Sequence, residues 1–490
     1  MTGDATDGRP PSAVVADGVD SAKRRLMESL PESLKRRLVG PYNRVLTVKA
    51  NREYRNRQRG LPSRTPAPDA PSHVVCVVVD ALRADAVTEE DSPLLHERLQ
   101  RDLVTPAPWT FPAVSSLVTG EYPHEHGAVR QSDESDTGST DLVIPPKLPD
   151  DRETLSDVLG SAGYDTYGGF AFHMPFFAIG GRFESHAVYD KAAVEEVFGD
   201  YEQWLDERPR DRTFSYLHVG DLHEPVEPPL PYWGRYDIDR EIPHLTTWDY
   251  EEVTDPGPEG ERYRDHRKRL YRAALAYVDD RLARLHHTLT RQFGDDVALV
   301  VTGDHGEAFW EHTAFDADHF VDSRPAYCVD HGGTPYESLA RVPLAVDGLD
   351  LGTGDDESGD DSPGTDNDDG LASLIDLAPT ILDVTGLSDA FETTGVPLQS
   401  GVPADRIALV ESARYGYEKK AAYLADWKLV VSRRDDESVG FRLPDEVPTD
   451  LPSDVERQLT EALPAWPDGE QADVRVSGMA QQRLEDLGYV

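Results

Sequence analysis

The stretch "HVVCVVVD", His73–Asp80, is the strongest structural signal in this sequence. Its central residues are all Val or Cys, without the polar–apolar alternation of a strand that is exposed on one face. Such a short β-branched run is typical of a strand buried on both faces of a parallel sheet. The run ends in Asp80, at the carboxyl end of the strand, where open α/β sheets bind their ligands. We therefore expect a functional site at that edge.

Three other stretches predict strands that end in polar residues, namely "FSYLHVGDLHEP" (Phe214–Pro225), "DVALVVTGDHG" (Asp296–Gly306) and "ARVPLAVDG" (Ala340–Gly348). Helical patterns lie between them, at Arg152–Tyr164 and over the long segment His266–Phe293, which has one apolar face. Strands that alternate with helices predict an α/β fold. We expect a large central sheet, mostly parallel or mixed, that is sandwiched by helices.

The chain divides into three regions by composition. Residues 1–70 are expected to form a disordered tail, a basic helical arm and a Pro-rich linker. Residues 71–400 form the main α/β domain, in which the low-complexity acidic stretch 350–370 is expected to be a surface loop. Residues 401–490 contain short segments of alternating polar and apolar residues. They predict a small subdomain of antiparallel strands with a closing helix.

The charge of the chain is extreme. Lys and Arg number 49 and Asp and Glu 92, which gives a formal net charge of −43. Such self-repulsion loosens a compact state in dilute salt, but the Debye length falls to about 3 Å near 1 M salt. The composition therefore indicates adaptation to a cytoplasm of high salt concentration; an ordinary acidic protein is the alternative. It also argues against nucleic-acid binding, which requires positive charge.

Other sequence features bear on the cellular location. The two cysteines, Cys76 and Cys328, are too few for a disulfide framework, and Cys76 is expected to be a small buried hydrophobic residue. No stretch reaches the roughly 18 consecutive apolar residues of a membrane-spanning helix. The first residues show no charged segment followed by an apolar one, as a secretion signal would. The sequence therefore predicts a soluble, cytoplasmic protein.

The basic arm, residues 21–60, has leucines at every fourth position from Leu26 to Leu38, which predicts an amphipathic helix. This helix could pack on the acidic body of the protein. It could instead touch an anionic membrane surface, at the inner face of the membrane, or a glycan. Packing is favoured, because Pro31 interrupts the pattern and aromatic anchors are few.

The residues suited to chemistry stand at strand ends and at one helix start. Asp80, Asp304 and His305 follow predicted strands, and Thr110 precedes a predicted helix within "APWTFPAVSSLVTGEYPHEHG" (Ala107–Gly127). Each alone is weak evidence, since such residues often serve as caps or turns. Together they predict a divalent cation, Mn²⁺, Zn²⁺, Mg²⁺ or Ca²⁺, that would turn the Thr110 hydroxyl into a nucleophile.

In this order, the motifs resemble those of the alkaline phosphatase superfamily, specifically its sulfatase-like branch, in a haloarchaeal form. The resemblance covers roughly residues 72–490 and implies a metal-dependent enzyme that acts on an anionic ester. It implies that Asp80, Thr110, Asp304 and His305 hold the metal. The motifs that carry it are "VVVDALRADAV" (77–87), "WTFPAVSSLVTGEYPHEHG" (109–127), "DLHEPVEPP" (221–229), "VVTGDHGEAFWEH" (300–312) and "HGGTPYESLARVPLAV" (331–346).

The sequence departs from the resemblance at the nucleophile. Thr110 stands where sulfatases carry Cys or Ser, and Ala113 and Val114 replace the Ser and Arg of their motif. Oxidation of Thr would give a ketone, so the formylglycine of sulfatases is not available. Thr nucleophiles occur in the relatives that act on phosphorus, which favours a phosphoester or phosphonate over a sulfate ester. The alternatives are a sulfatase with an unmodified Thr and a non-catalytic protein that binds an anion or glycan.

His223 and His331 are the candidates to stabilise or protonate the leaving oxygen. Asp221 is a candidate ligand of a second cation, but its histidine partner cannot be chosen among His312, His319 and His331. 

His124 and His126 resemble a metal pair, yet they follow the predicted nucleophile helix, and we expect structural or rim roles for them. Residues 164–190 and 225–262 carry no motif and are expected to be loops that select the substrate.

Overall fold

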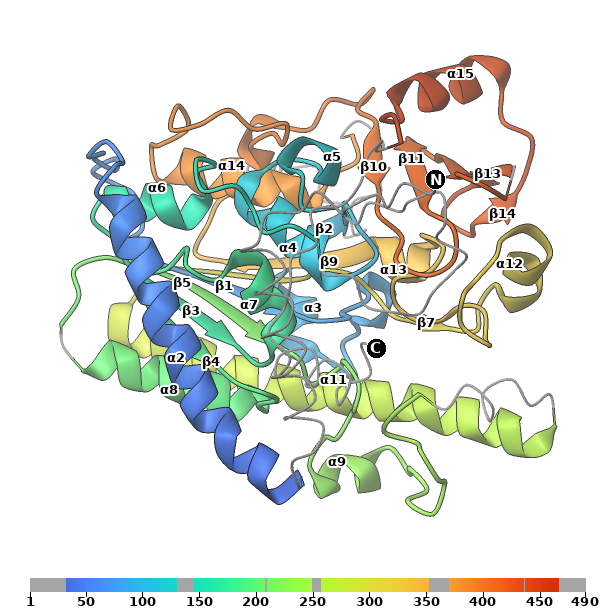
Figure 1. The fold of residues 1–490 in the computed structure, drawn as a ribbon, viewed down its shortest axis with the longest axis horizontal. Helices are drawn as coiled ribbons and strands as arrows, with labels where there is room; N and C mark the ends of the chain where they lie inside the picture. Colours follow the sequence, from blue (N-terminus) through green and yellow to red (C-terminus); the bar gives the residue numbers. More distant parts are fainter. Residues whose placement is uncertain are drawn as a thin grey trace, which may run out of the picture.

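The computed structural model describes residues 32–129, 145–207, 209–248, 257–351, 370–435 and 437–466. At its centre is a seven-stranded sheet (Figure 1). β9 runs antiparallel to β2 and β6, while β6, β1, β5, β3 and β4 are parallel to one another. The predicted α/β fold with a mixed central sheet is confirmed. Across the sheet, the strands are β2 (Leu99–Val104), β9 (Arg341–Asp347), β6 (Val297–Gly303), β1 (His73–Val79), β5 (Thr213–Val219), β3 (Asp165–Phe170) and β4 (Ser185–Val188).

β1 is the middle strand, and its residues Val74–Val79 are fully buried, as the continuous apolar run predicts. It pairs in parallel with β5 and β6, and Val79 lies opposite both Val219 and Gly303. The residues that directly follow these three strands therefore leave the sheet side by side at its carboxyl edge.

Helices cover both faces of this sheet (Figure 1). On one face lie α8 (Val194–Asp206) and α11 (Pro258–Phe293), and α11 is longer than the segment His266–Phe293 that the sequence predicts. On the other face lie α4 (Thr110–Thr119), α6 (Leu155–Ser161) and α14 (Leu377–Val384). α4 is buried along its whole length, which fixes the position of its first residue relative to the sheet.

A five-stranded antiparallel sheet stands beside the main sheet, with β10 near β2. The alternation that predicts these strands is not matched by their burial, since β11 is buried from Lys419 to Tyr423. α15 (Ser453–Ala462) packs against β11 and β12. The predicted closing helix and most of the acidic stretch 350–370 lie outside the described residues. The strands are β10 (Ala408–Val410), β11 (Lys419–Leu424), β12 (Trp427–Ser432), β13 (Ser438–Arg442) and β14 (Val447–Pro448).

The expectation that residues 164–190 form a loop is wrong. They contain β3, α7 (His173–Ile179) and β4. β3 reads "DTYGGF", and its glycines weaken the sequence signal of a strand. Their role is steric, since a Cβ at Gly168 would lie 2.8 Å from ring atoms of Phe170 and Phe183. β2 was also missed, because charged residues interrupt its apolar pattern.

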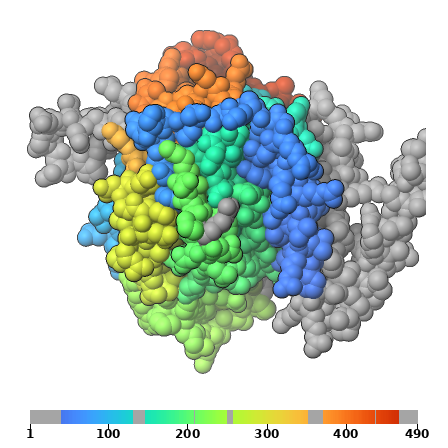
Figure 2. All heavy atoms as spheres, turned by 90° about the vertical axis from the view of Figure 1, so that its left-hand side faces the viewer, coloured from blue at the N-terminus to red at the C-terminus, as the bar shows by residue number. Residues whose placement is uncertain are grey.

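Residues 32–58 of the basic arm form α2 (Glu32–Gln58), which runs along one face of the body (Figure 2). The predicted disordered tail and the predicted leucine face from Leu26 to Leu38 lie outside the residues whose side chains the structure describes. α2 packs on that body, as predicted: Asn43 Oδ1 lies 2.9 Å from Nε2 of His173. Val45 and Val48 point outward, 65% and 69% exposed. Contact of this arm with an anionic surface or glycan stays a prediction. None of the helices in the described ranges is both long enough and apolar enough to cross a bilayer.

We expect Arg182→Ala to destabilise the protein strongly. Arg182 Nη1 lies 2.9 Å from Asp157 Oδ2, and neither side chain is exposed to solvent. The substitution removes the nearer of two cations from this buried carboxylate and leaves only Arg57, whose Nε lies 3.5 Å from Asp157 Oδ1; the loss is up to about 3–5 kcal/mol. Urea unfolding measures the loss.

The control is Arg281→Ala. Arg281 pairs with Glu195 at 3.3 Å, with the two side chains 15% and 47% exposed. Such a pair contributes about 0–1 kcal/mol. A smaller loss for Arg182→Ala than for Arg281→Ala would contradict this account of the buried pair.

Candidate active site

The four predicted metal-binding side chains meet at the carboxyl edge of the main sheet. Asp80 follows β1, Asp304 and His305 follow β6, and Thr110 opens α4. All four are at most 1% exposed. The parallel register of β1 and β6 brings the two aspartates together, and the buried helix α4 delivers the hydroxyl.

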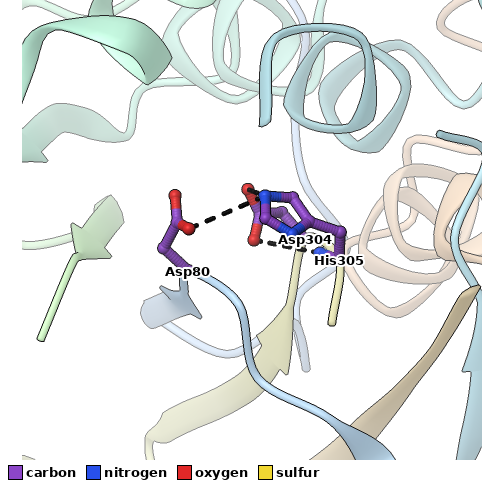
Figure 3. Close-up of side chains that lie close together, drawn as sticks. All are labelled: Asp80, Asp304 and His305. Atoms are coloured by element: carbon purple, nitrogen blue, oxygen red, sulfur yellow. Dashed lines mark hydrogen bonds and ion pairs between the residues drawn. The ribbon is translucent and has the colours of Figure 1, made fainter. Parts of the chain in front are cut away.

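The side chains of Asp80, Asp304 and His305 point at one another (Figure 3). Thr110 Oγ1 donates a hydrogen bond to Asp80 Oδ2 at 3.1 Å and lies 3.3 Å from His305 Nε2. That nitrogen is 3.5 Å from Asp304 Oδ2 and 3.6 Å from Asp80 Oδ1. One ligand atom from each of Asp80, Asp304 and His305 lies within 4.8 Å of the others.

These atoms fit a divalent cation. Asp80 Oδ1 and Asp304 Oδ2 are buried and receive no hydrogen bond from any residue in the described ranges. His305 Nδ1 is 2.8 Å from the carbonyl oxygen of Gly306 and donates to it, which leaves Nε2 as an electron-pair donor toward the carboxylates. Gly306 is required here, because a Cβ would lie 2.0 Å from the Ser338 carbonyl oxygen.

His218 also belongs to this cluster, although no sequence motif predicts it. It lies inside β5, and its Nε2 is 3.1 Å from Asp80 Oδ2 and 4.0 Å from Asp304 Oδ2. Tyr216 Oη, 2.8 Å from His218 Nδ1, donates to that nitrogen, so that the Nε2 proton faces Asp80. The signal in the sequence is a single histidine in a strand whose other residues are all uncharged.

The electrostatics of the two aspartates differ. Burial opposes the ionisation of Asp80, but His223, His218 and His305 outweigh it and hold the pKa of Asp80 below its usual range. Burial and the neighbouring Asp80 carboxylate raise the pKa of Asp304. Two adjacent carboxylates in the interior repel each other, and a cation between them would offset this repulsion.

His223 and His331 lie beside this cluster. The ring centroid of His331 is 4.7 Å from that of His305 and 4.9 Å from that of His223. His223 Nδ1 donates to the Glu224 carbonyl oxygen at 2.8 Å, and burial lowers the pKa of His223 to about 4. A pocket adjoins His223, and its lining is Ala171, Phe172, Lys191, Ala192, Gly220, His223 and Glu224.

The other candidate ligands named from the sequence contact residues outside this cluster. Asp221 turns away, and its Oδ1 accepts a hydrogen bond from the Val194 amide at 3.3 Å. The remaining four histidines bind carboxylates or a hydroxyl, as follows: His312 with Glu446 (2.9 Å), His319 with Glu437 (3.5 Å), His124 with Glu411 (2.6 Å) and His126 with Ser116 (2.9 Å). The last two contacts agree with the structural roles expected for His124 and His126.

Comparison with known proteins gives consistent matches. A family model described as Sulfatase matches residues 72–387. The choline-sulfatase of Rhizobium meliloti is 27% identical over 47% of this chain and 42% of its own length. The low-salt glycan biosynthesis sulfotransferase Agl7 of Haloferax volcanii is 24% identical over 64% of this chain and 61% of its own. The chain thus spans about half the length of these curated relatives.

Solved structures share the fold. BT4656, in complex with its substrate D-glucosamine-2-N,6-O-disulfate, has a TM-score of 0.58 at 16% identity, covering 80% of this chain and 96% of that one. The phosphonate monoester hydrolase of Silicibacter pomeroyi has a TM-score of 0.53 at 16% identity, covering 80% and 93%. At these identities, the likeness concerns the fold alone.

We expect His218→Asn to weaken metal binding about 10- to 100-fold, because a ligand loses the partner that orients it. Asn keeps a polar group near the position of Nδ1 but cannot reach Asp80. Calorimetric titration of the metal-free protein with Mn²⁺ measures the change. His126→Asn is the matched control, since His126 is equally buried but bonds to Ser116. Equal Mn²⁺ affinity in the two variants would show that His218 does not support the site.

Proposed function

The chain belongs to the sulfatase family, and we propose that it is a metal-dependent enzyme that cleaves a sulfate or phosphorus ester, or transfers its acid group, through Thr110. One observation carries this proposal. The Thr110 hydroxyl is within hydrogen-bond reach of Asp80 and His305, in a buried cluster at a helix start. Both partners are candidate metal ligands, whereas the buried hydroxyl of Thr119 bonds to main-chain oxygens of its own helix.

Asp80, Asp304, His305 and the Thr110 hydroxyl are the groups that would hold the cation. When bound there, a divalent cation lowers the pKa of a hydroxyl and offsets negative charge on an ester oxygen. Thr110 stands at the start of α4, where free main-chain amides and the helix dipole favour the anionic group of the substrate.

In the proposed reaction, Thr110 Oγ1 loses its proton and forms a bond to phosphorus or sulfur as the bond to the ester oxygen breaks. Asp80 Oδ2 already accepts the hydrogen bond from that hydroxyl and is the nearest acceptor for the proton. His223 and His331 are proposed to stabilise the charge on the leaving oxygen. Water, or a hydroxyl of an acceptor molecule, then displaces the acid group from Thr110.

We propose phosphorus rather than sulfur as the reacting centre, because Thr110 cannot supply the aldehyde of formylglycine. The structural neighbours include phosphonate monoester hydrolases as well as sulfatases, so the fold is compatible with this choice. The choline-sulfatase and the glycan sulfotransferase among the relatives support chemistry at sulfur, and the sulfotransferase supports transfer as the alternative to hydrolysis. We also propose that the enzyme works in a salt-rich cytoplasm, on the support of its net charge of −43.

Thr110→Ala should abolish turnover, with a loss of at least about 10³-fold, because the attacking oxygen is removed. Thr110→Ser keeps that oxygen and should retain measurable turnover. Both variants should still bind inorganic phosphate or sulfate. Turnover by Thr110→Ala close to that of the wild type would remove Thr110 from the mechanism.

A substrate panel in molar KCl tests the reacting centre and the cation. We expect faster cleavage of p-nitrophenyl phosphate, bis-p-nitrophenyl phosphate or a phosphonate monoester than of p-nitrophenyl sulfate. EDTA should stop turnover and added Mn²⁺ or Zn²⁺ should restore it, because the proposed nucleophile depends on the cation. A preference for the sulfate ester would contradict the choice of phosphorus, and full activity in EDTA would contradict metal dependence.

A further inference from the structure

A second cluster of ligand-type side chains lies next to the candidate metal centre. Glu307, Asp330 and His331 each present one oxygen or nitrogen atom within 4.8 Å of the others. β7 (Ala308–Phe309) and β8 (Val329–Asp330) pair as short antiparallel strands, and this pairing brings Glu307 beside the other two residues.

This cluster concentrates negative charge in the interior. Glu307 is 1% exposed, and Asp330 and His331 are each 3% exposed. Arg324 Nη1 is 3.7 Å from Asp330 Oδ2, but the same guanidinium also binds Asp322 at 2.7 Å. One guanidinium is therefore shared between two carboxylates. The other group that faces both carboxylates of the cluster is His331 Nδ1, which lies 2.7 Å from Asp330 Oδ1 and 3.5 Å from Glu307 Oε2.

Glu307 has one carboxylate oxygen directed into the cluster without a donor. Its Oε1 accepts a hydrogen bond from Trp248 Nε1 at 3.1 Å. Its Oε2 is buried, receives no hydrogen bond within the part of the chain that the structure describes, and lies 3.5 Å from His331 Nδ1. The guanidinium of Arg267 stacks over the Trp248 ring, 4.4 Å from the ring centroid. Its positive charge is therefore separated from the Glu307 carboxylate by the indole. A cation next to Oε2 would give this buried oxygen the partner that it lacks.

The second cluster lies directly beside the first. The His331 ring stacks on His305 at 4.7 Å, and its centroid is 4.9 Å from that of His223. A cation in this cluster would therefore face the same ester that the Thr110 hydroxyl faces, on the side of His223 and His331.

We propose that Glu307, Asp330 and His331 bind a second divalent cation. Two carboxylate oxygens and one imidazole nitrogen match the ligand types of the first centre and suit Mn²⁺ or Zn²⁺. Binding makes His331 a ligand and releases any proton on the coordinating nitrogen. The role of this cation, to offset charge on the leaving oxygen, rests on the proposed function; its binding does not.

Counting bound Mn²⁺ tests the proposal. The full-length chain is cleared of metal with EDTA in molar KCl, dialysed against Mn²⁺ and analysed for metal per chain. We expect two equivalents for the wild type and one for Glu307→Gln, which keeps the size of the side chain and loses its charge. Glu311→Gln is the matched control with two equivalents, because Glu311 is partly exposed and pairs with Arg83.

Asp330→Asn is a second variant, which tests the proposal even if Glu307→Gln fails to fold. Asp330 has φ of +61°, a conformation that Asn adopts readily, so the fold should persist while one equivalent is lost. Circular dichroism checks the fold of each variant. Electron paramagnetic resonance of the Mn²⁺-loaded wild type should show two coupled ions, and Glu307→Gln should show an isolated one.

A single equivalent in the wild type, or an unchanged number in Glu307→Gln, overturns the proposal; protonated His331 would then balance the two carboxylates. Asp304→Asn should lose the first cation and keep the second. Two equivalents together with unaffected turnover by Thr110→Ala would refute the proposed function and leave this inference standing. The two failures are therefore distinguishable.

Discussion

Asp80 and Asp304 are buried side by side at the ends of adjacent parallel strands, and the rest of the site follows from the need to balance their charge. Ligand atoms of the two lie within 4.8 Å, with neither side chain exposed. At that separation, two unit negative charges repel by about 3.5 kcal/mol at an effective dielectric constant near 20. This electrostatic repulsion is located at the carboxyl edge of the sheet, where open α/β sheets bind their ligands.

The C-terminal sheet helps to hold the nucleophile segment in place. Trp109, which precedes Thr110, donates its indole hydrogen to the Ser412 carbonyl oxygen at 2.7 Å. The Gly332 amide, next to His331, donates to the Pro108 carbonyl oxygen at 2.7 Å. The segment "PWT" is thus fixed from two sides, by a residue of the main domain and by one that follows β10. These two hydrogen bonds explain why Pro108 and Trp109 precede Thr110, whose hydroxyl must be held in a fixed position.

The sequence predicted those parts of the fold and site that depend on local patterns. β1, β6 and β9 are largely apolar runs, and β5 mixes apolar residues with Thr, Ser and His. Asp80, Asp304, His305 and Thr110 stand at element ends, where a sequence pattern can be recognised. β3 was missed because Gly168 and Gly169 remove the apolar signal, and the space is filled by distant rings. His218 was missed inside a strand, because facing a carboxylate depends on the pairing of β5 with β1. Glu307 joins Asp330 only through the two-residue strands β7 and β8, which no periodicity predicts.

The central claim is that Thr110 shares a cation with Asp80, Asp304 and His305, and a crystal structure of the Mn²⁺-soaked protein tests it most directly. Anomalous scattering at the manganese edge locates the ion without assumptions about its ligands. The account predicts a peak bonded to the two carboxylates, to His305 Nε2 and to Thr110 Oγ1. Manganese that binds elsewhere, or a peak beyond bonding distance of the threonine hydroxyl, would contradict it.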